Sequence, residues 1–258
     1  MKFNREFANQ IIDDLINCVD TASKEIMQIY NSDNFETSDK ADGSPLTLAD
    51  KASNQIITEG LKKITPDIAV ISEETFEDTI LKALPNLYWL VDPLDGTREF
   101  INKNDEFTVN IALIEDRKPV FGIVAAPVFE KCWHGSIFDN YHSDKSIPDV
   151  LRIVMSKSHK SDNDKSFLNY LNEKGVNYKI IEKGSSLKLC AIADNEADIY
   201  PRFGPTSEWD IAAAHSVLSA YGGCVLKVDD FSDLSYAKKE SILNPVSYTH
   251  LTLPTKEG

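Results

Sequence analysis

The stretch LYWLVDPLDGTREF, at residues 87–100, joins an apolar run to two closely spaced acids. The apolar residues predict a buried strand that ends at Asp92, and Asp95 follows where the chain turns into Gly96 and Thr97. Such a turn can aim both carboxylates at one point, where like charges repel unless a cation separates them. Mg²⁺ prefers oxygen ligands of this kind, and the amides after Asp95 suit an anion if a helix begins there. Taken alone, this spacing is more commonly a turn with solvated acids, so the other segments decide between the two readings.

Composition indicates an ordinary globular protein of one large domain or two small ones. The chain has 258 residues, of which 42% are apolar and 26% charged, and its net charge is −14. The acidic excess argues against a general nucleic-acid binder. It does not argue against a small anionic substrate, because a local basic pocket or metal ions can override the overall charge.

The cysteines and the first residues bear on location. The four cysteines form no CxxC pair, which indicates free thiols in a reducing cytoplasm. Residues 1–20 carry charges among their apolar positions, so they predict neither a signal peptide nor a membrane span. We expect a cytoplasmic protein; peripheral association with the inner membrane stays open, as does the oligomeric state.

Hydrophobic periodicity predicts two halves with different rhythms. Residues 1–150 read as an α+β half with helices at 5–30 and about 47–64 and an antiparallel meander. Residues 151–245 alternate strands and helices, which predicts an α/β half. Its expected helices are 161–174, one from about 186, and 208–220. The polar, threonine-rich segment VSYTHLTLPTKEG, 246–258, shows no continuation of the fold, and we interpret it as a non-native tail.

Further acids fall where they could complete a metal site. Glu73 and Glu74, in ISEE, end a second predicted strand, and Asp210, in EWD, opens a predicted helix. Asp50, in SPLTLAD, lies on the first turns of another helix. Each also has a structural explanation, since an Asp near a helix N-terminus is a common cap or dipole partner. Any one of these motifs is therefore weak evidence.

Together and in this order, the motifs KADGSPLTLAD, ISEE, WLVDPLDGT and EWDIAAA…YGG resemble the lithium-sensitive, Mg²⁺-dependent phosphatase superfamily. That group contains inositol monophosphatases, fructose-1,6-bisphosphatases and bisphosphate nucleotidases, and the resemblance covers about residues 5 to 245. The segments DGTREFINKNDEFTVNIALIE and GSSLKLCAIADNEADIYPRFGPTSEWD are most similar to 3′(2′),5′-bisphosphate nucleotidases of the CysQ type. Inositol phosphatases usually have an Asn-Phe pair soon after DGT, where this chain has Arg98, Glu99 and Phe100.

The resemblance implies a layered αβαβα sandwich with a metal site between its halves. One Mg²⁺ is expected on Glu73, Asp92 and the carbonyl of Leu94, and a second on Asp92, Asp95 and Asp210. A third, weaker ion is expected near Glu73, held through waters. These two to three ions are the cofactors that the resemblance implies, and their positive charge would offset the repulsion between the paired acids.

The resemblance also assigns the catalytic and phosphate-binding groups. Asp50 and Thr97 are expected to form a dyad that orients and deprotonates the attacking water, and the metal ions are expected to activate that water. The amides of Gly96 and Thr97 are expected to hold the scissile phosphate. This division suits phosphoryl transfer, which needs positioning and charge neutralisation more than covalent chemistry.

A second set of residues is expected to bind the rest of the nucleotide. By resemblance, Ser185, Lys188 and Arg202 hold the other phosphate, and Asp210 also lies on the substrate. A dianion needs cations and hydroxyl donors of this kind. His159, in SKSHK, is either a further contact or a plain loop residue. The structural alternatives are a solvated helix lysine for Lys188 and a surface ion pair for Arg202.

The expected reaction is Mg²⁺-dependent hydrolysis of the 3′-phosphate of adenosine 3′,5′-bisphosphate to AMP and phosphate. The sulfated nucleotide is a second expected substrate, and the expected role is to clear a by-product of sulfate assimilation. The alternatives are an inositol or sugar phosphatase, a non-catalytic metal- or nucleotide-binding protein, and a damaged gene product destabilised by a foreign tail. The intact Asp50 and Thr97 argue against the non-catalytic alternative, because a pure binder needs no water-activating dyad.

Overall fold

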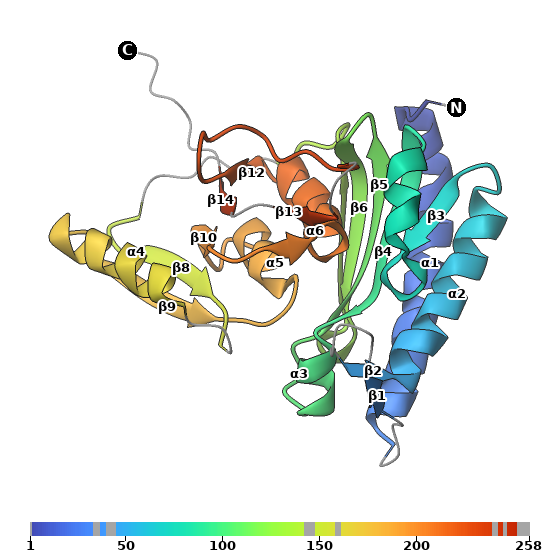
Figure 1. Cartoon of the computed structure of the whole chain (residues 1–258), viewed down its shortest axis with the longest axis horizontal. Coiled ribbons are helices and arrows are strands. Elements are labelled where there is room, and N and C mark those ends of the chain that lie inside the picture. The colour runs from blue at the N-terminus through green and yellow to red at the C-terminus, as the bar shows by residue number, and fades with distance from the viewer. Residues whose placement is uncertain are drawn as a thin grey trace.

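The structure, a computed structural model, is an αβαβα sandwich (Figure 1). It describes residues 2–32, 37–39, 45–141, 148–157, 161–238, 242–244 and 247–251. The layers are a helix pair, a five-stranded sheet, a second helix pair, another five-stranded sheet and an outer helix. The expected fold class is thereby confirmed. No helix in the described part of the chain is long and apolar enough to cross a membrane.

The first layer is formed by α1 (Arg5–Tyr30) and α2 (Leu48–Ile64), which pack against each other and against the first sheet. The buried side chains of α1 recur at helical spacing, as its sequence predicts. Asn4 caps α1, and its side chain accepts a hydrogen bond from the Phe7 amide. Thr47 and Asp50 form a capping box that fixes the start of α2. This box also orients the Asp50 carboxylate.

The first sheet has the strand order β3-β4-β5-β6-β7. Its strands are β3 (Ala69–Ser72), β4 (Leu87–Asp95), β5 (Thr108–Glu115), β6 (Lys118–Ala126) and β7 (Lys131–Ser136). β3 and β4 run parallel, and the remaining neighbours are antiparallel. Helices cover both faces, so the central strands are continuous apolar runs. The expected meander is confirmed, but β4 passes Asp92 and reaches Asp95 through a register shift.

The middle layer consists of α5 (Leu187–Ala193) and α6 (Glu208–Ala220). Nearly all of α6 is buried, because it packs on the first sheet and also contacts the second. A Cβ atom at Gly122 would lie 2.1 Å from the carbonyl oxygen of Ala213, so glycine on β6 permits this close approach. One hydrophobic core runs through this layer from β4 to β12, and it joins the parts on either side of residue 150.

The second sheet has the order β12-β14-β10-β8-β9. Its strands are β8 (Leu151–Met155), β9 (Tyr178–Glu182), β10 (Ile199–Arg202), β12 (Gly223–Lys227) and β14 (Ser247–Leu251). The outer helix α4 (Asp162–Glu173) packs on it through a small apolar cluster. Short elements complete the described chain: β1 (Thr37–Asp39), β2 (Pro45–Thr47), α3 (Thr97–Ile101), β11 (Thr206–Ser207), β13 (Leu243–Asn244), and 3₁₀ turns at Glu73–Thr75, Asp78–Ala83 and Pro127–Phe129.

The C-terminal segment, whose sequence leaves open whether it folds, contributes strand β14 to the second sheet. β14 lies between β12 and β10 and pairs antiparallel with both, so without it the second sheet would split. Thr249 of this strand is buried. Backbone pairing on both edges places this strand, and a polar sequence does not reveal such pairing. The division at residue 150 and the non-native origin of 246–258 remain predictions.

Candidate active site

The end of β4 gathers the groups that its sequence singles out. Asp92 is 2% exposed, and its Oδ1 accepts a hydrogen bond of 3.1 Å from the Leu94 amide. Gly96 follows with φ +93°, a conformation that favours glycine. A Cβ atom there would also lie 3.1 Å from the carbonyl oxygen of Glu106. The turn therefore requires glycine, and it places Asp95 and α3 beside Asp92.

Four carboxylates from three elements repel one another at this point. Burial raises the pKa of Asp92 well above its usual range, and the charges of Glu73, Asp95 and Asp210 raise it further. Burial and the charge of Asp95 raise the pKa of Asp210 to about 7. The pKa of Asp95 is raised mainly by burial, although Lys188 and a hydrogen bond from Ser186 oppose that shift. β4, α6 and the 3₁₀ turn that follows β3 thus bring all four acids of the predicted metal site together.

This donor set suits a hard divalent cation. Buried carboxylates that raise one another's pKa lack positive charge, and a cation would favour their ionised forms. The described residues contain no group of three or more His, Cys, Asp or Glu side chains already arranged to hold an ion. The fit therefore rests on the oxygen donors and on the excess of negative charge.

Asp50 and Thr97 are in direct contact. The Thr97 hydroxyl donates to Asp50 Oδ1 at 3.0 Å, and the Leu94 carbonyl oxygen lies 3.3 Å from it. The other oxygen of Asp50, Oδ2, accepts from the Thr47 amide at 2.7 Å and from the Thr47 hydroxyl at 2.5 Å. The carboxylate is 1% exposed, so both of its oxygens are held by groups from the chain. The dyad expected from the sequence has the geometry of a proton-accepting pair.

A cavity of about 170 Å³ extends from Asp95 and Asp210 toward the second sheet. Its wall brings together five of the predicted substrate residues, namely Gly96, Ser185, Lys188, Arg202 and Asp210. Thr97, which bonds to Asp50, directly follows the lining residue Gly96. His159 lies outside the described residues. The roles of these residues remain predictions, but the tertiary structure places most of them around one space.

Lys188 and Arg202 are not the solvated lysine and the surface ion pair that were considered as alternatives to phosphate binding. Lys188 is only 7% exposed, which excludes a solvated helix lysine. Its ammonium group donates to the Ser185 carbonyl oxygen at 2.7 Å. Arg202 donates to the carbonyl oxygens of Gly204 and Pro205, at 3.2 and 3.0 Å, rather than forming a described surface ion pair. Both cations are therefore held at the cavity by main-chain oxygens.

Several residues at the site were not anticipated. Thr206 donates to Asp210 Oδ2 at 2.5 Å, and the Ser207 amide donates to the same oxygen at 3.0 Å. Glu99 lines the cavity, and the Ser186 hydroxyl contacts Asp95 from a distant part of the chain. Two local signals existed: the repeated serine in GSSLK, of which only Ser185 was selected, and the capping box of Ser207 and Asp210 at the start of α6. The contact of Ser186 with Asp95 depends on long-range packing.

Comparison with known proteins identifies the family of the chain. The model of the inositol monophosphatase family matches residues 8–254. The 3′(2′),5′-bisphosphate nucleotidase CysQ of Salmonella typhimurium is 42% identical over 235 residues, which cover 87% of this chain and 93% of that protein. The enzyme of the same name from Escherichia coli K12 is 39% identical over 246 residues, 91% of this chain and 97% of that protein.

A solved structure has the same architecture. The crystal structure of CysQ from Bacteroides thetaiotaomicron, described as a bacterial member of the inositol monophosphatase family, superimposes with a TM-score of 0.80. It is 33% identical in sequence, and the match covers 92% of this chain and 96% of that one. An inositol monophosphatase from Anabaena, 20% identical with a TM-score of 0.69, shares the fold.

Proposed function

Because this chain belongs to the inositol monophosphatase family, we propose that it is a 3′(2′),5′-bisphosphate nucleotidase that hydrolyses adenosine 3′,5′-bisphosphate to AMP and phosphate. The observation that carries the proposal is the cavity that joins Asp95 and Asp210 at one end to Lys188 and Arg202. A substrate with two phosphates suits a site with two separate places for anions. The relatives named as bisphosphate nucleotidases, 39–42% identical, support the same substrate class.

Phosphatases of this family are metal-dependent, generally on Mg²⁺. The residues that would hold the ions are Glu73, Asp92, Asp95, Asp210 and the Leu94 carbonyl group, and we infer two to three ions. When bound, the ions supply positive charge that neutralises the phosphoryl group and the buried acids. The rest of the chemistry is assigned to side chains of this chain.

The dyad would accept the proton of the attacking water. Thr97 donates its own hydrogen to Asp50, so its oxygen is free to accept a hydrogen bond from water. As the water oxygen bonds to phosphorus, the bond from phosphorus to the ribose 3′-oxygen breaks. The proton of the water would pass to Thr97 and the Thr97 proton to Asp50, and the released 3′-oxygen would take up a proton from solvent. The capping box keeps Asp50 in place during this transfer, because Thr47 holds the oxygen that faces away. Gly96 and Thr97 would contribute their amides to the scissile phosphate.

The second phosphate would bind on the loop before α5. The Ser185 hydroxyl is buried and has no hydrogen-bond partner among the described residues, which is unfavourable until an acceptor arrives. Ser185 also has φ +40°, a strained conformation for a residue other than glycine. Lys188 and Arg202 supply the positive charge on the same wall. The sulfated nucleotide, whose 5′-phosphate carries the sulfate, is a second substrate in this proposal.

We place the protein in the cytoplasm, where it would clear a by-product of sulfate assimilation. Its four cysteines are free, which suits a reducing compartment. The partner in this proposal is a small nucleotide rather than a nucleic acid, given the net charge of −14.

Phosphate release from a substrate panel tests the proposal. Adenosine 3′,5′-bisphosphate, its 5′-phosphosulfate, 3′-AMP, inositol 1-phosphate and fructose 1,6-bisphosphate are compared at one Mg²⁺ concentration. The bisphosphate nucleotide should have the highest kcat/KM. Preference for inositol phosphate or fructose bisphosphate would instead assign a sugar or inositol phosphatase, and absence of any turnover would indicate a binding protein.

A further inference from the structure

Ser186 makes a contact that its place in the sequence does not require. It is 2% exposed and stands at the N-cap of α5, where a serine hydroxyl usually accepts a hydrogen bond from a helix amide. Within the described structure the Ser186 side chain makes no such cap. Its hydroxyl instead lies 3.0 Å from Asp95 Oδ2 and 2.8 Å from the main-chain oxygen of Asp210.

These two acceptors belong to different elements of the fold. Asp95 ends β4 of the first sheet, and Asp210 lies in the first turn of α6. Ser186 is 91 residues from Asp95 and 24 from Asp210 in the chain. A single hydroxyl therefore links both acids to the loop that leads into α5. Loss of this hydroxyl would remove one donor from a buried carboxylate, which costs more than loss of an exposed contact.

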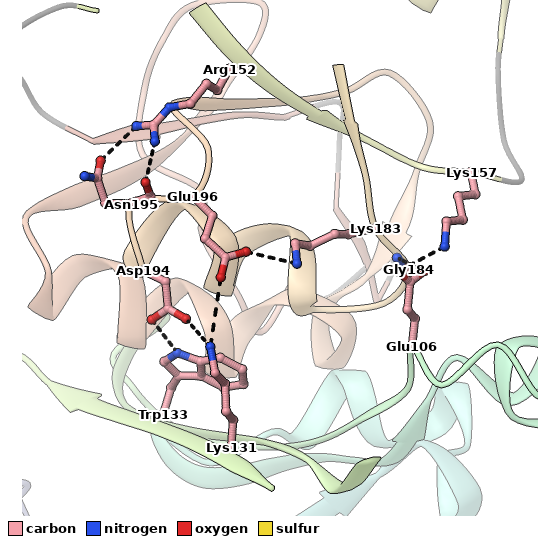
Figure 2. Close-up of polar contacts among 10 residues, drawn as sticks. All are labelled: Glu106, Lys131, Trp133, Arg152, Lys157, Lys183, Gly184, Asp194, Asn195 and Glu196. Carbon is pink, nitrogen blue, oxygen red and sulfur yellow. Dashed lines mark hydrogen bonds and ion pairs between the residues drawn. The ribbon is translucent and has the colours of Figure 1, made fainter. Parts of the chain in front are cut away.

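The loop itself is held at its other end. The Gly184 amide donates to Glu106 Oε2 at 3.0 Å, and Lys157 pairs with Glu106 Oε1 at 3.1 Å (Figure 2). Lys183 pairs with Glu196 at 3.0 Å on the other side of the loop. A Cβ atom at Gly184 would lie 3.0 Å from the Glu106 carbonyl oxygen, so the loop packs closely against the first half of the chain. The loop that carries Ser186 is thus anchored by the contacts of Lys183 and Gly184, independently of Asp95.

We propose that Ser186 is a positioning residue for the hydrolytic site, whose hydroxyl holds Asp95 and the Asp210 main chain in the arrangement that binds the divalent cation. The inference rests on the proposed function for the identity of the reaction. Groups that orient metal ligands in this way typically change metal affinity or activity by about 10–100-fold when they are removed. Ser185, one residue earlier, is assigned to the nucleotide side, so adjacent serines would serve the two ends of one cavity.

Isothermal titration of the metal-free protein with Mg²⁺ tests this role directly. Ser186→Ala should raise the Kd for Mg²⁺ about tenfold or more. The matched control is Ser216→Ala, because Ser216 is 1% exposed and donates to the Gly135 carbonyl oxygen, away from the site. The control should keep the wild-type Mg²⁺ affinity. Thermal unfolding in excess chelator shows how far each variant is destabilised.

Steady-state kinetics provides a second readout. At saturating Mg²⁺, Ser186→Ala should lower kcat and leave KM for the bisphosphate within about threefold, whereas Ser185→Ala should mainly raise KM. If Ser186→Ala does not fold, Ser186→Cys replaces the hydroxyl by a weak S–H donor of similar size and is measured in the same way.

The outcomes separate this inference from the proposed function. A Ser186 variant that binds Mg²⁺ within twofold of wild type overturns the inference, as does an equal loss of affinity in Ser216→Ala or a wild-type protein that does not bind Mg²⁺. If the Mg²⁺ contrast appears but the wild-type protein does not hydrolyse the bisphosphate, the positioning role stands and the proposed substrate is wrong.

Discussion

Replacing Lys188 with methionine separates the two ends of the proposed substrate. Methionine keeps an unbranched apolar stem in this buried position and removes the positive charge. The ammonium group lies in the wall of the cavity and is held there by the Ser185 carbonyl oxygen at 2.7 Å. A hydrogen bond to a charged group contributes about 1.5–3 kcal/mol. At tenfold per about 1.4 kcal/mol, its loss corresponds to about 10- to 150-fold in binding of the second phosphate.

The same substitution also acts on the metal end, and the assay must separate the two effects. Lys188 lowers the pKa of Asp95, so its removal raises that pKa and weakens the carboxylate as a ligand. This effect is common to all substrates. The kcat/KM for adenosine 3′,5′-bisphosphate is therefore divided by that for 3′-AMP, which lacks the second phosphate. This ratio should fall by about 10- to 150-fold, the range given by the lost charged hydrogen bond.

A matched control and a clear contrary result complete the experiment. Lys183→Met removes a lysine from the same loop, but Lys183 pairs with Glu196 and does not line the cavity. It should leave the ratio unchanged. If Lys188→Met lowers kcat/KM equally for both substrates, Lys188 acts through Asp95 alone and the second-phosphate site lies elsewhere.

The remaining predictions concern the dyad, the ions and pH. Thr97→Ala should lower kcat by about 10²–10⁴-fold with a small change in KM, measured by phosphate release at saturating Mg²⁺. If Thr97→Ala instead raises KM as much as Lys188→Ala does and leaves kcat unchanged, the dyad is not catalytic. Asp95→Asn should lower turnover by orders of magnitude, and a near wild-type rate would make Asp95 a turn residue. Excess chelator should abolish activity and lithium should inhibit it; full turnover in chelator contradicts the metal site. In metal-free protein, the raised pKa values of Asp92, Asp95 and Asp210 mean that the folded state binds more protons than the unfolded state. Their contribution to stability is therefore lost as pH rises toward about 7, the pKa of Asp210. The unfolding temperature of the chelated protein should fall as pH rises from about 4 to about 7, and Mg²⁺ should reverse the fall; a flat profile would show that these acids do not repel.

Local interactions explain why the sequence predicted so many elements. The buried face of α1 repeats every three or four residues, and the capping box of Thr47 and Asp50 spans only four positions. The turn at Gly96 is likewise a local requirement for a positive φ. Such signals depend on neighbours in the chain, so they can be read without knowledge of the fold. The proposed ligand residues were recognised differently, because each short motif was weak alone and only the resemblance of all of them together to one family assigned the roles.

Long-range contacts could not be read in this way. β14 is polar, and its place is set by pairing with β10 and β12. Similarly, a serine next to the selected Ser185 gives no sign that its hydroxyl reaches Asp95, because that contact spans 91 residues.

The sequence by itself determined the helices, the core strands and the turn at Gly96, because periodicity, capping and turn geometry act over a few residues. Its motifs, taken together, also selected the acids that we propose as metal ligands. Only the tertiary structure decided that Lys188 is buried at the cavity, that the polar segment β14 belongs to the second sheet, and that Ser186, on the loop before α5, contacts Asp95. Each of these depends on which distant backbones pack together. That choice is made by the whole core, since the free energy of burial depends on the complete set of contacts rather than on any one segment.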